Sequence, residues 1–83
     1  MDMKKILRQQ FMVAVENQLR DGDPPETALT LLRLKEEGYT EQQAKEMISA
    51  CIAAEMFSVM ESNEPFNEQR YVGWLARLPQ VPE

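Results

Sequence analysis

The feature that most constrains the fold is residues 47–60, MISACIAAEMFSVM, in which eleven of fourteen residues are apolar. On a helix these residues would fall on two faces. One face contains Ile48, Cys51, Ile52 and Val59, and the other contains Ala50, Ala53, Ala54 and Phe57. A helix that is apolar on nearly all sides must be covered on nearly all sides. Because a chain of 83 residues has little material for this, we expect either the central helix of a bundle or a helix partly covered by a second chain.

The first two predicted helices cover residues 3–21 and 24–37. Apolar residues recur at helical spacing in the first, namely Met3, Ile6, Leu7, Phe11, Ala14, Val15 and Leu19. Asp2 is placed to cap its start, and Gly22 to end it in the left-handed conformation. The segment Asp23-Pro24-Pro25-Glu26 predicts that Asp23 caps the second helix in a variant of the capping box.

The last two predicted helices cover residues 41–62 and 68–77. Gly38 and Tyr39 predict a Schellman-type stop, and Thr40 with Gln43 predicts a capping box immediately afterwards. The segment 63–65, Asn-Glu-Pro, ends the third helix, and Asn67 caps the fourth. No segment alternates with a period of two, so we expect no sheet. The predicted fold is all-α, a small four-helix bundle with short antiparallel connections, in one domain of residues 1–83 with an extended tail at 78–83.

Composition limits the cellular compartments, the binding partners and the thiol chemistry that we expect for the chain. The net charge is −5, and residues 21–83 carry all of the excess negative charge, which disfavours nonspecific binding to nucleic acid or anionic membrane. The single cysteine, Cys51, cannot form an internal disulfide, and the chain contains no histidine to activate a thiol. We therefore expect a cytoplasmic protein with Cys51 as a packed core thiol. Neither a signal peptide nor a membrane-spanning run is evident.

Glu55 is the charged residue with the most interesting position, because it falls within the apolar core stripe of the third helix. A buried carboxylate must be paired, hydrogen-bonded or protonated. One interpretation is a structural ion pair with Arg20, Arg33 or Arg70. The other is an inward-facing carboxylate that works with Glu16 as an acid/base pair or a metal ligand.

Other site signals are weak. Lys4, Lys5 and Arg8 form a basic cluster on the first helix, which leaves open a small regulator that touches nucleic acid, although no aromatic residues are interleaved with them. The three glycines do not have phosphate-loop spacing. Helix-bundle metal sites use Glu-x-x-His pairs, which a chain without histidine cannot form. We expect no cofactor, no metal and no catalytic residues.

The best binding candidates are apolar. Methionine-rich helical faces adapt to varied partners, and aromatic residues on a short last helix either anchor an interface or cover the core. The candidate interface residues are Met47, Met56, Phe57, Met60, Tyr71 and Trp74. They predict an interaction module, either a homodimer or a binder of another protein, rather than an enzyme.

Several segments resemble small uncharacterised bacterial helical proteins of the domain-of-unknown-function type. These are residues 15–19, 23–27, 33–34 and 38–39, together with Glu55, residues 65–66 and residues 71–79. The resemblance implies a helical fold and a bacterial cytosolic setting, and it brings no activity. Residues 38–44 also look like the loop of ubiquitin-associated domains, but the long apolar third helix departs from that fold.

Overall fold

A computed structural model describes the backbone of residues 3–82 and the side chains of residues 7–82. It contains four helices, α1 (Met3–Asp21), α2 (Pro25–Glu36), α3 (Glu41–Ser62) and α4 (Glu68–Arg77). The rest of the described chain is turn and loop, with no strand. The predicted all-α four-helix fold is confirmed, and the predicted bounds of α1, α3 and α4 are confirmed as well.

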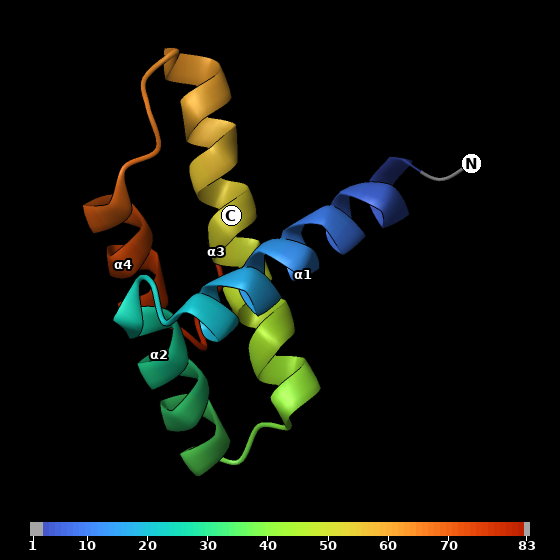
Figure 1. Ribbon diagram of the computed structural model, residues 1–83, viewed down its shortest axis with the longest axis vertical. Coiled ribbons are helices and arrows are strands. Elements are labelled where there is room, and N and C mark those ends of the chain that lie inside the picture. The colour runs from blue at the N-terminus through green and yellow to red at the C-terminus, as the bar shows by residue number, and fades with distance from the viewer. Residues whose placement is uncertain (1–2, 83) are drawn as a thin grey trace.

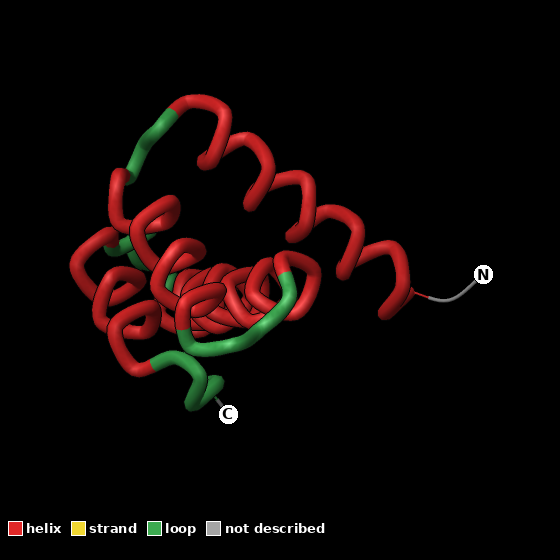
Figure 2. The backbone as a smooth tube through the Cα atoms, turned by 90° about the horizontal axis from the view of Figure 1, so that it is seen from below, coloured by secondary structure: helices red, strands yellow, loops and turns green. Residues whose placement is uncertain are grey.

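The long helix α3 is the centre of the molecule and contacts each of the other three helices. Helices α2 and α4 pack beside each other along one side of α3, whereas α1 crosses α3 obliquely (Figure 1). The N-terminal half of α1 extends away from the other helices in both views (Figures 1 and 2). We refer to residues 3–10 as the α1 arm.

The turn between α2 and α3 has the predicted geometry. Gly38 has φ +104°, its amide donates to the Lys35 carbonyl, and the Tyr39 amide donates to the Leu34 carbonyl. These two bonds form a Schellman motif. The Thr40 hydroxyl accepts from the Gln43 amide, and the Gln43 side chain accepts from the Thr40 amide, both at 3.0 Å. The predicted capping box is therefore confirmed.

The predicted start of α2 was wrong. Pro24, with an extended backbone, occupies the N-cap position, and no side chain caps the helix. Proline disfavours the helical conformation in the residue before it, so Pro25 keeps Pro24 out of the helix. The helix consequently begins at Pro25, and Asp23 lies one residue too early to cap it.

The remaining helix ends follow the sequence signals. Gly22 has φ +64° after α1, and Asn63 has φ +60° after α3. The Asn67 side chain accepts from the Arg70 amide at 3.0 Å and caps α4. The predicted cap at Asp2 lies outside the described residues. Residues 78–82 form a non-helical tail that begins with a turn.

The core lies between α3 and its three neighbours. Its fully buried apolar residues come from every helix and from the start of the tail, namely Val15, Leu34, Ala44, Ile48, Cys51, Ile52, Tyr71, Leu75 and Leu78. The apolar stripe predicted along all of α1 is covered only in part. Phe11, Ala14 and Leu19 pack against the core, whereas Leu7 in the α1 arm is 48% exposed.

Candidate functional site

The candidate site is the side of α3 that faces away from the core. The core side carries Ile48, Cys51, Ile52 and Glu55, all buried. Residues on the opposite side follow one another at helical spacing, and we call them the outer face of α3: Ala50, Ala53, Met56, Phe57 and Met60. Within this face Phe57 is 61% exposed and Met60 is 78% exposed. Of the second apolar face read from the sequence, Ala50, Ala53 and Ala54 are therefore half-buried, and Phe57 is the residue that the described part of the chain leaves exposed.

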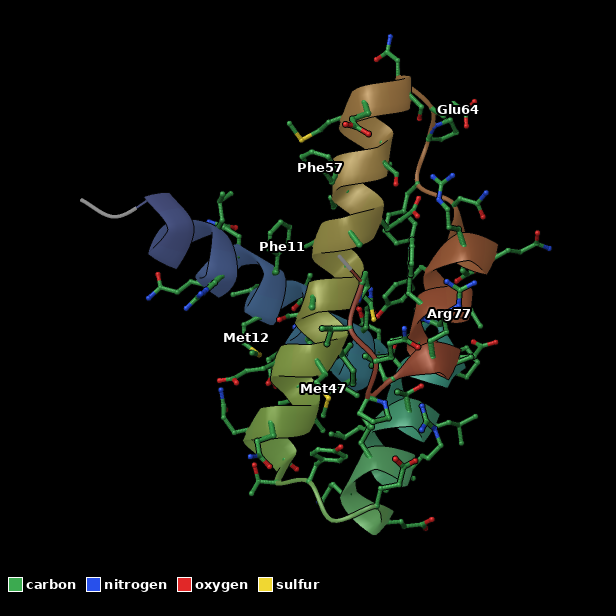
Figure 3. All side chains as sticks on the ribbon, turned by 180° about the vertical axis from the view of Figure 1, so that it is seen from behind. Phe11, Met12, Met47, Phe57, Glu64 and Arg77 are labelled. Atoms are coloured by element: carbon green, nitrogen blue, oxygen red, sulfur yellow. The ribbon has the colours of Figure 1, made fainter. Side chains whose placement is uncertain are left out.

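A groove of about 760 Å³ lies beside this face, between α1 and α3. Leu7, Phe11 and Met12 line it from α1, and Ala50 and Ala53 line it from α3. Figure 3 shows Phe11 and Met12 pointing from α1 towards α3, with Phe57 further along α3 on the same side of that helix. The two alanines leave space in which another helix can approach the α3 backbone closely.

Three of the six predicted interface residues do not lie on this surface. Tyr71 is fully buried in the core and is not presented at the surface of the described chain. Met47 and Trp74 are half-buried and pack against the same core. The Arg77 guanidinium lies over the Trp74 ring, and its central carbon is 5.5 Å from the ring centroid. The short helix α4 uses its aromatic residues to close the core rather than to present them.

The other three predicted interface residues, Met56, Phe57 and Met60, are exposed on one side of α3. They are not the sole apolar residues at the surface, because α2 exposes Leu29 and Leu32. Leu29 lines a small groove of about 180 Å³ between α2 and α4. On α3, the groove between α1 and α3 ends at Ala53, one turn before Phe57, so the exposed residues of α3 begin where that groove ends.

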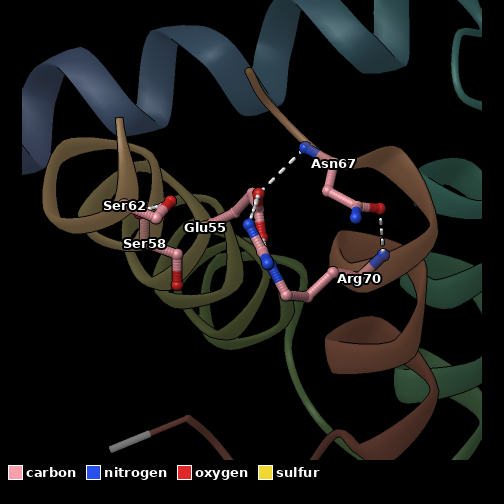
Figure 4. Close-up of polar contacts among 5 residues, drawn as sticks. All are labelled: Glu55, Ser58, Ser62, Asn67 and Arg70. Atoms are coloured by element: carbon pink, nitrogen blue, oxygen red, sulfur yellow. Dashed lines mark hydrogen bonds and ion pairs between the residues drawn. The ribbon is translucent and has the colours of Figure 1, made fainter. Parts of the chain in front are cut away.

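Glu55 is held in a structural ion pair (Figure 4). Arg70 donates from Nε to Oε1 at 2.6 Å and from Nη2 to Oε2 at 2.8 Å, and the Asn67 amide donates to Oε2 at 2.9 Å. The hydrogen bond from Arg70 holds the pKa of Glu55 below its ordinary value and outweighs burial, which raises that pKa. Of the three arginines considered as its partner, Arg70 is the one observed.

Glu16 does not join Glu55. It is exposed on α1, where its carboxylate lies 2.8 Å from the Lys45 ammonium. The hydrogen bond that Lys45 donates to Glu16 raises the pKa of Lys45. The two carboxylates proposed as an acid/base pair are therefore each bound to a separate cation. The pKa of Glu55 is lowered, whereas a general acid near neutral pH requires a raised pKa.

A buried polar cluster joins α1, α2 and α4, and no sequence signal identified it. The hydroxyls of Tyr71 and Thr27 both donate to Gln18 Oε1 at 2.7 Å, and the two hydroxyl oxygens lie 3.2 Å apart. Burial raises the pKa of Tyr71 to about 12. The cluster satisfies polar atoms beneath the surface and fixes the three helices relative to one another.

Arg33, which the sequence offered only as a candidate partner of Glu55, has a structural role of its own. From α2 it donates to the carbonyls of Leu78 and Leu75 at the end of α4, at 2.9 and 3.0 Å. It also lies 2.7 Å from Glu37. A cation at a helix C-terminus satisfies carbonyls that have no partner within the helix. Arg33 thus attaches the tail to α2.

The basic cluster of α1 is described only at Arg8, which is exposed and lines the groove; the side chains of Lys4 and Lys5 lie outside the described residues. Within residues 7–82, no group of three potential metal ligands lies together. None of the described helices is long and apolar enough to cross a membrane. No protein-family model, curated protein or solved structure compared with the chain matches it.

Proposed function

We propose that this chain is a small helical interaction module that associates with a second copy of itself through the outer face of α3. The observation that carries the proposal is the exposure of Phe57 and Met60 on a helix whose opposite side forms the core. A contiguous apolar patch on a small domain is typical of a protein–protein contact. Methionine next to an aromatic residue also suits such a contact, because both are enriched at interfaces.

The energetics favour covering this face. Fully burying one medium-sized apolar side chain stabilises a contact by roughly 1.5–3 kcal/mol. A core of this size supplies only about 3–5 kcal/mol of net stability. Covering Met56, Phe57 and Met60 would therefore be a substantial gain for the chain.

The other functions considered from the sequence receive less support. An enzymatic bundle needs inward carboxylates with free acid/base capacity, and Glu55 is instead bound by Arg70 and the Asn67 amide. A nucleic-acid regulator needs a basic surface of some extent, and the acidic body of the chain opposes it. We propose a non-enzymatic role in the cytoplasm, where a buried single thiol requires no disulfide partner.

The experiment is the solution mass by light scattering over a roughly hundredfold dilution, for the wild type and for Phe57→Glu. We expect a wild-type dimer and a monomeric variant, because a carboxylate at the contact would be desolvated without a partner. Leu32→Glu is the matched control. Leu32 is 58% exposed on α2, close to the 61% of Phe57, so the two substitutions disturb the folded monomer to a similar degree.

Circular dichroism shows whether both variants retain their helices. A folded Phe57→Glu that keeps the wild-type mass would rule out the outer face of α3 as the contact. A wild type that is monomeric at every concentration would rule out self-association altogether. Dissociation by Leu32→Glu, with no effect of Phe57→Glu, would move the contact to α2.

A further inference from the structure

The side chains of the α1 arm that the structure describes, residues 7–10, are all exposed. Leu7 is 48% exposed, and Arg8, Gln9 and Gln10 are also exposed. Leu7 and Arg8 nevertheless line the groove that faces α3. The arm and the C-terminal half of α3 leave their crossing in different directions and form a V (Figures 1 and 3). Leu7 is exposed on one limb of the V, and Phe57 and Met60 are exposed on the other.

A two-fold axis parallel to the bisector of this V would exchange the directions of its two limbs. The axis must be displaced from the plane of the V by about half of the 8–10 Å that separates packed helices, because an axis in that plane would superpose the arm of one copy on α3 of the other. Rotation by half a turn would then lay the α1 arm of each copy beside α3 of the other copy. The arm runs towards the crossing and α3 runs away from it, so the paired helices would be antiparallel. The positive N-terminal end of α1 would then lie near the negative C-terminal end of α3, which is a favourable arrangement of helix dipoles.

The charges of the two limbs are complementary. Residues 3–15 contain the basic residues Lys4, Lys5 and Arg8 and no acidic residue. Residues 46–69 contain five glutamates and no basic residue. Glu55 is neutralised within the chain by Arg70, whereas Glu61 is exposed in the last turn of α3. Complementary charges of this kind determine which surfaces pair and in which direction.

The spacing along the helices gives the register. Phe11 and Ala53 line the same groove. Leu7 precedes Phe11 by one helical turn, and Phe57 follows Ala53 by one turn. If the two-fold axis passes near Phe11 and Ala53, Leu7 of one copy would lie against Phe57 of the other. Glu61 lies one further turn along the same side of α3, opposite the start of the arm, and the long Arg8 side chain extends in that direction because helical side chains tilt towards the helix N-terminus.

We infer that the dimer is formed by reciprocal exchange of the α1 arms, each arm packing antiparallel on the outer face of α3 of the second copy, with Leu7 against Phe57 and Arg8 near Glu61. This inference rests on the proposed self-association and specifies its geometry. It explains why α1 continues for about two turns beyond the helices that cover its C-terminal half. It also assigns a partner to exposed Leu7 of the arm and to exposed Phe57 of α3.

Charge reversal tests the exchange directly, with dimer dissociation constants measured by sedimentation at low salt. Arg8→Glu and Glu61→Arg would each place like charges opposite each other at both copies of the contact. We expect each variant alone to dissociate roughly tenfold or more readily than the wild type. An equimolar mixture of the two variants would contain heterodimers in which both contacts are again complementary, and these should regain wild-type affinity.

The matched control is a mixture of Arg8→Glu with Glu36→Arg, because Glu36 is an exposed glutamate on α2. The heterodimer in this mixture has one complementary contact and one like-charged contact, so its affinity should lie between those of Arg8→Glu and the wild type, and Glu36→Arg alone should dimerise as the wild type does. Circular dichroism and the unfolding midpoint show that the exposed substitutions leave the fold intact. A second readout is cross-linking of Leu7→Cys on one copy to Phe57→Cys on another. The native thiol of Cys51 is buried and does not compete.

The outcomes separate this inference from the proposed function. A wild type that never dimerises overturns both. A wild-type dimer that Phe57→Glu dissociates, but whose charge-reversed variants are not rescued by mixing, overturns arm exchange and leaves self-association through α3 standing. Rescue by mixing, together with a cross-link between residues 7 and 57 of different copies, supports the exchange. Full rescue by the Glu36→Arg mixture as well would show that only net charge matters and would overturn the specific pairing.

Discussion

The carboxylate of Glu55 and the guanidinium of Arg70 form a two-point ion pair that attaches α4 to the middle of α3. The Glu55 side chain is fully buried, whereas that of Arg70 is one-third exposed. The same carboxylate accepts from the Asn67 amide, and the Asn67 side chain caps α4. One buried acid on α3 therefore positions both the start and the first turn of α4, which in turn contributes Tyr71 to the core.

The first prediction is that Glu55→Gln destabilises the fold by about 1–3 kcal/mol. Glutamine retains the size of the side chain, but it removes the charge and replaces one acceptor with a donor that faces Arg70. The buried site is then left with an unmatched hydrogen bond. The measurement is the free energy of unfolding in urea, followed by circular dichroism at neutral pH.

The control for this substitution is Glu61→Gln on the same helix. Glu61 is exposed, so its replacement should change the stability of the monomer by no more than about 0.5 kcal/mol. These measurements belong at protein concentrations below the dimer range, because Glu61 has a proposed role between copies. Equal effects of the two substitutions would show that the ion pair of Glu55 contributes nothing specific.

The second prediction concerns the stability of the fold at acidic pH. The Arg70 hydrogen bond lowers the pKa of Glu55 in the folded state. Near the ordinary glutamate pKa of about 4.3, the unfolded chain therefore binds more protons than the folded chain. Stability from this group is then fully present above about pH 4.3 and falls as the pH drops through the folded pKa. The difference in unfolding free energy between the wild type and Glu55→Gln should shrink over that window.

Glu41 titrates in the same direction, because Lys45 lowers its pKa. It is exposed and is unaffected by Glu55→Gln, so its contribution cancels in the difference between the two proteins. The measurement is a series of urea titrations from about pH 3 to pH 7. A difference that stays constant throughout would mean that Glu55 has an ordinary pKa in the folded protein.

The third prediction is that Tyr71→Phe costs about 1 kcal/mol of stability, the usual net value of one hydrogen bond. The phenol group is buried with Thr27 and Gln18. After its removal, the Thr27 hydroxyl still donates to Gln18 Oε1, so no acceptor is left without a partner and the cost stays small. Gln18→Leu, which removes the shared acceptor of both hydroxyls, should cost more. The reverse order would contradict the assigned network.

The helix boundaries could be predicted because their causes are local. The Schellman turn at Gly38 and the capping box of Thr40 and Gln43 depend on residues within a few positions of one another. The one wrong start, at α2, has a local cause too, since Pro25 restricts the residue before it. The burial of Glu55 could be predicted from its place in the α3 stripe, but Arg70 was one of three equivalent candidates until α4 was placed.

The sequence could not predict which apolar helix faces are buried by other helices, because this depends on where helices distant in the sequence pack. The stripe of α1 is apolar at Leu7 just as at Phe11, yet only the latter lies over the body of the molecule. Likewise Tyr71 and Phe57 are both aromatic residues on apolar helices. Tyr71 is buried where α4 meets α1 and α2, while nothing in the described chain covers Phe57. Periodicity identifies a face, but it does not tell which neighbour is available to cover that face.

The last prediction concerns the thiol of Cys51. Burial raises its pKa to about 12, and the reactive species of a thiol is the thiolate. At about pH 8 an ordinary cysteine, with a pKa of about 8.5, is partly ionised. Native Cys51 should therefore react with an aromatic disulfide reagent roughly a thousandfold more slowly than the urea-unfolded chain. Ser62→Cys provides the control, because Ser62 is exposed on the same helix. In that variant, the exposed Cys at position 62 should release one equivalent of aromatic thiol from the reagent at once, and Cys51 should release the second equivalent only on unfolding. Rapid reaction of both thiols in the native protein would mean that α3 opens readily from the core.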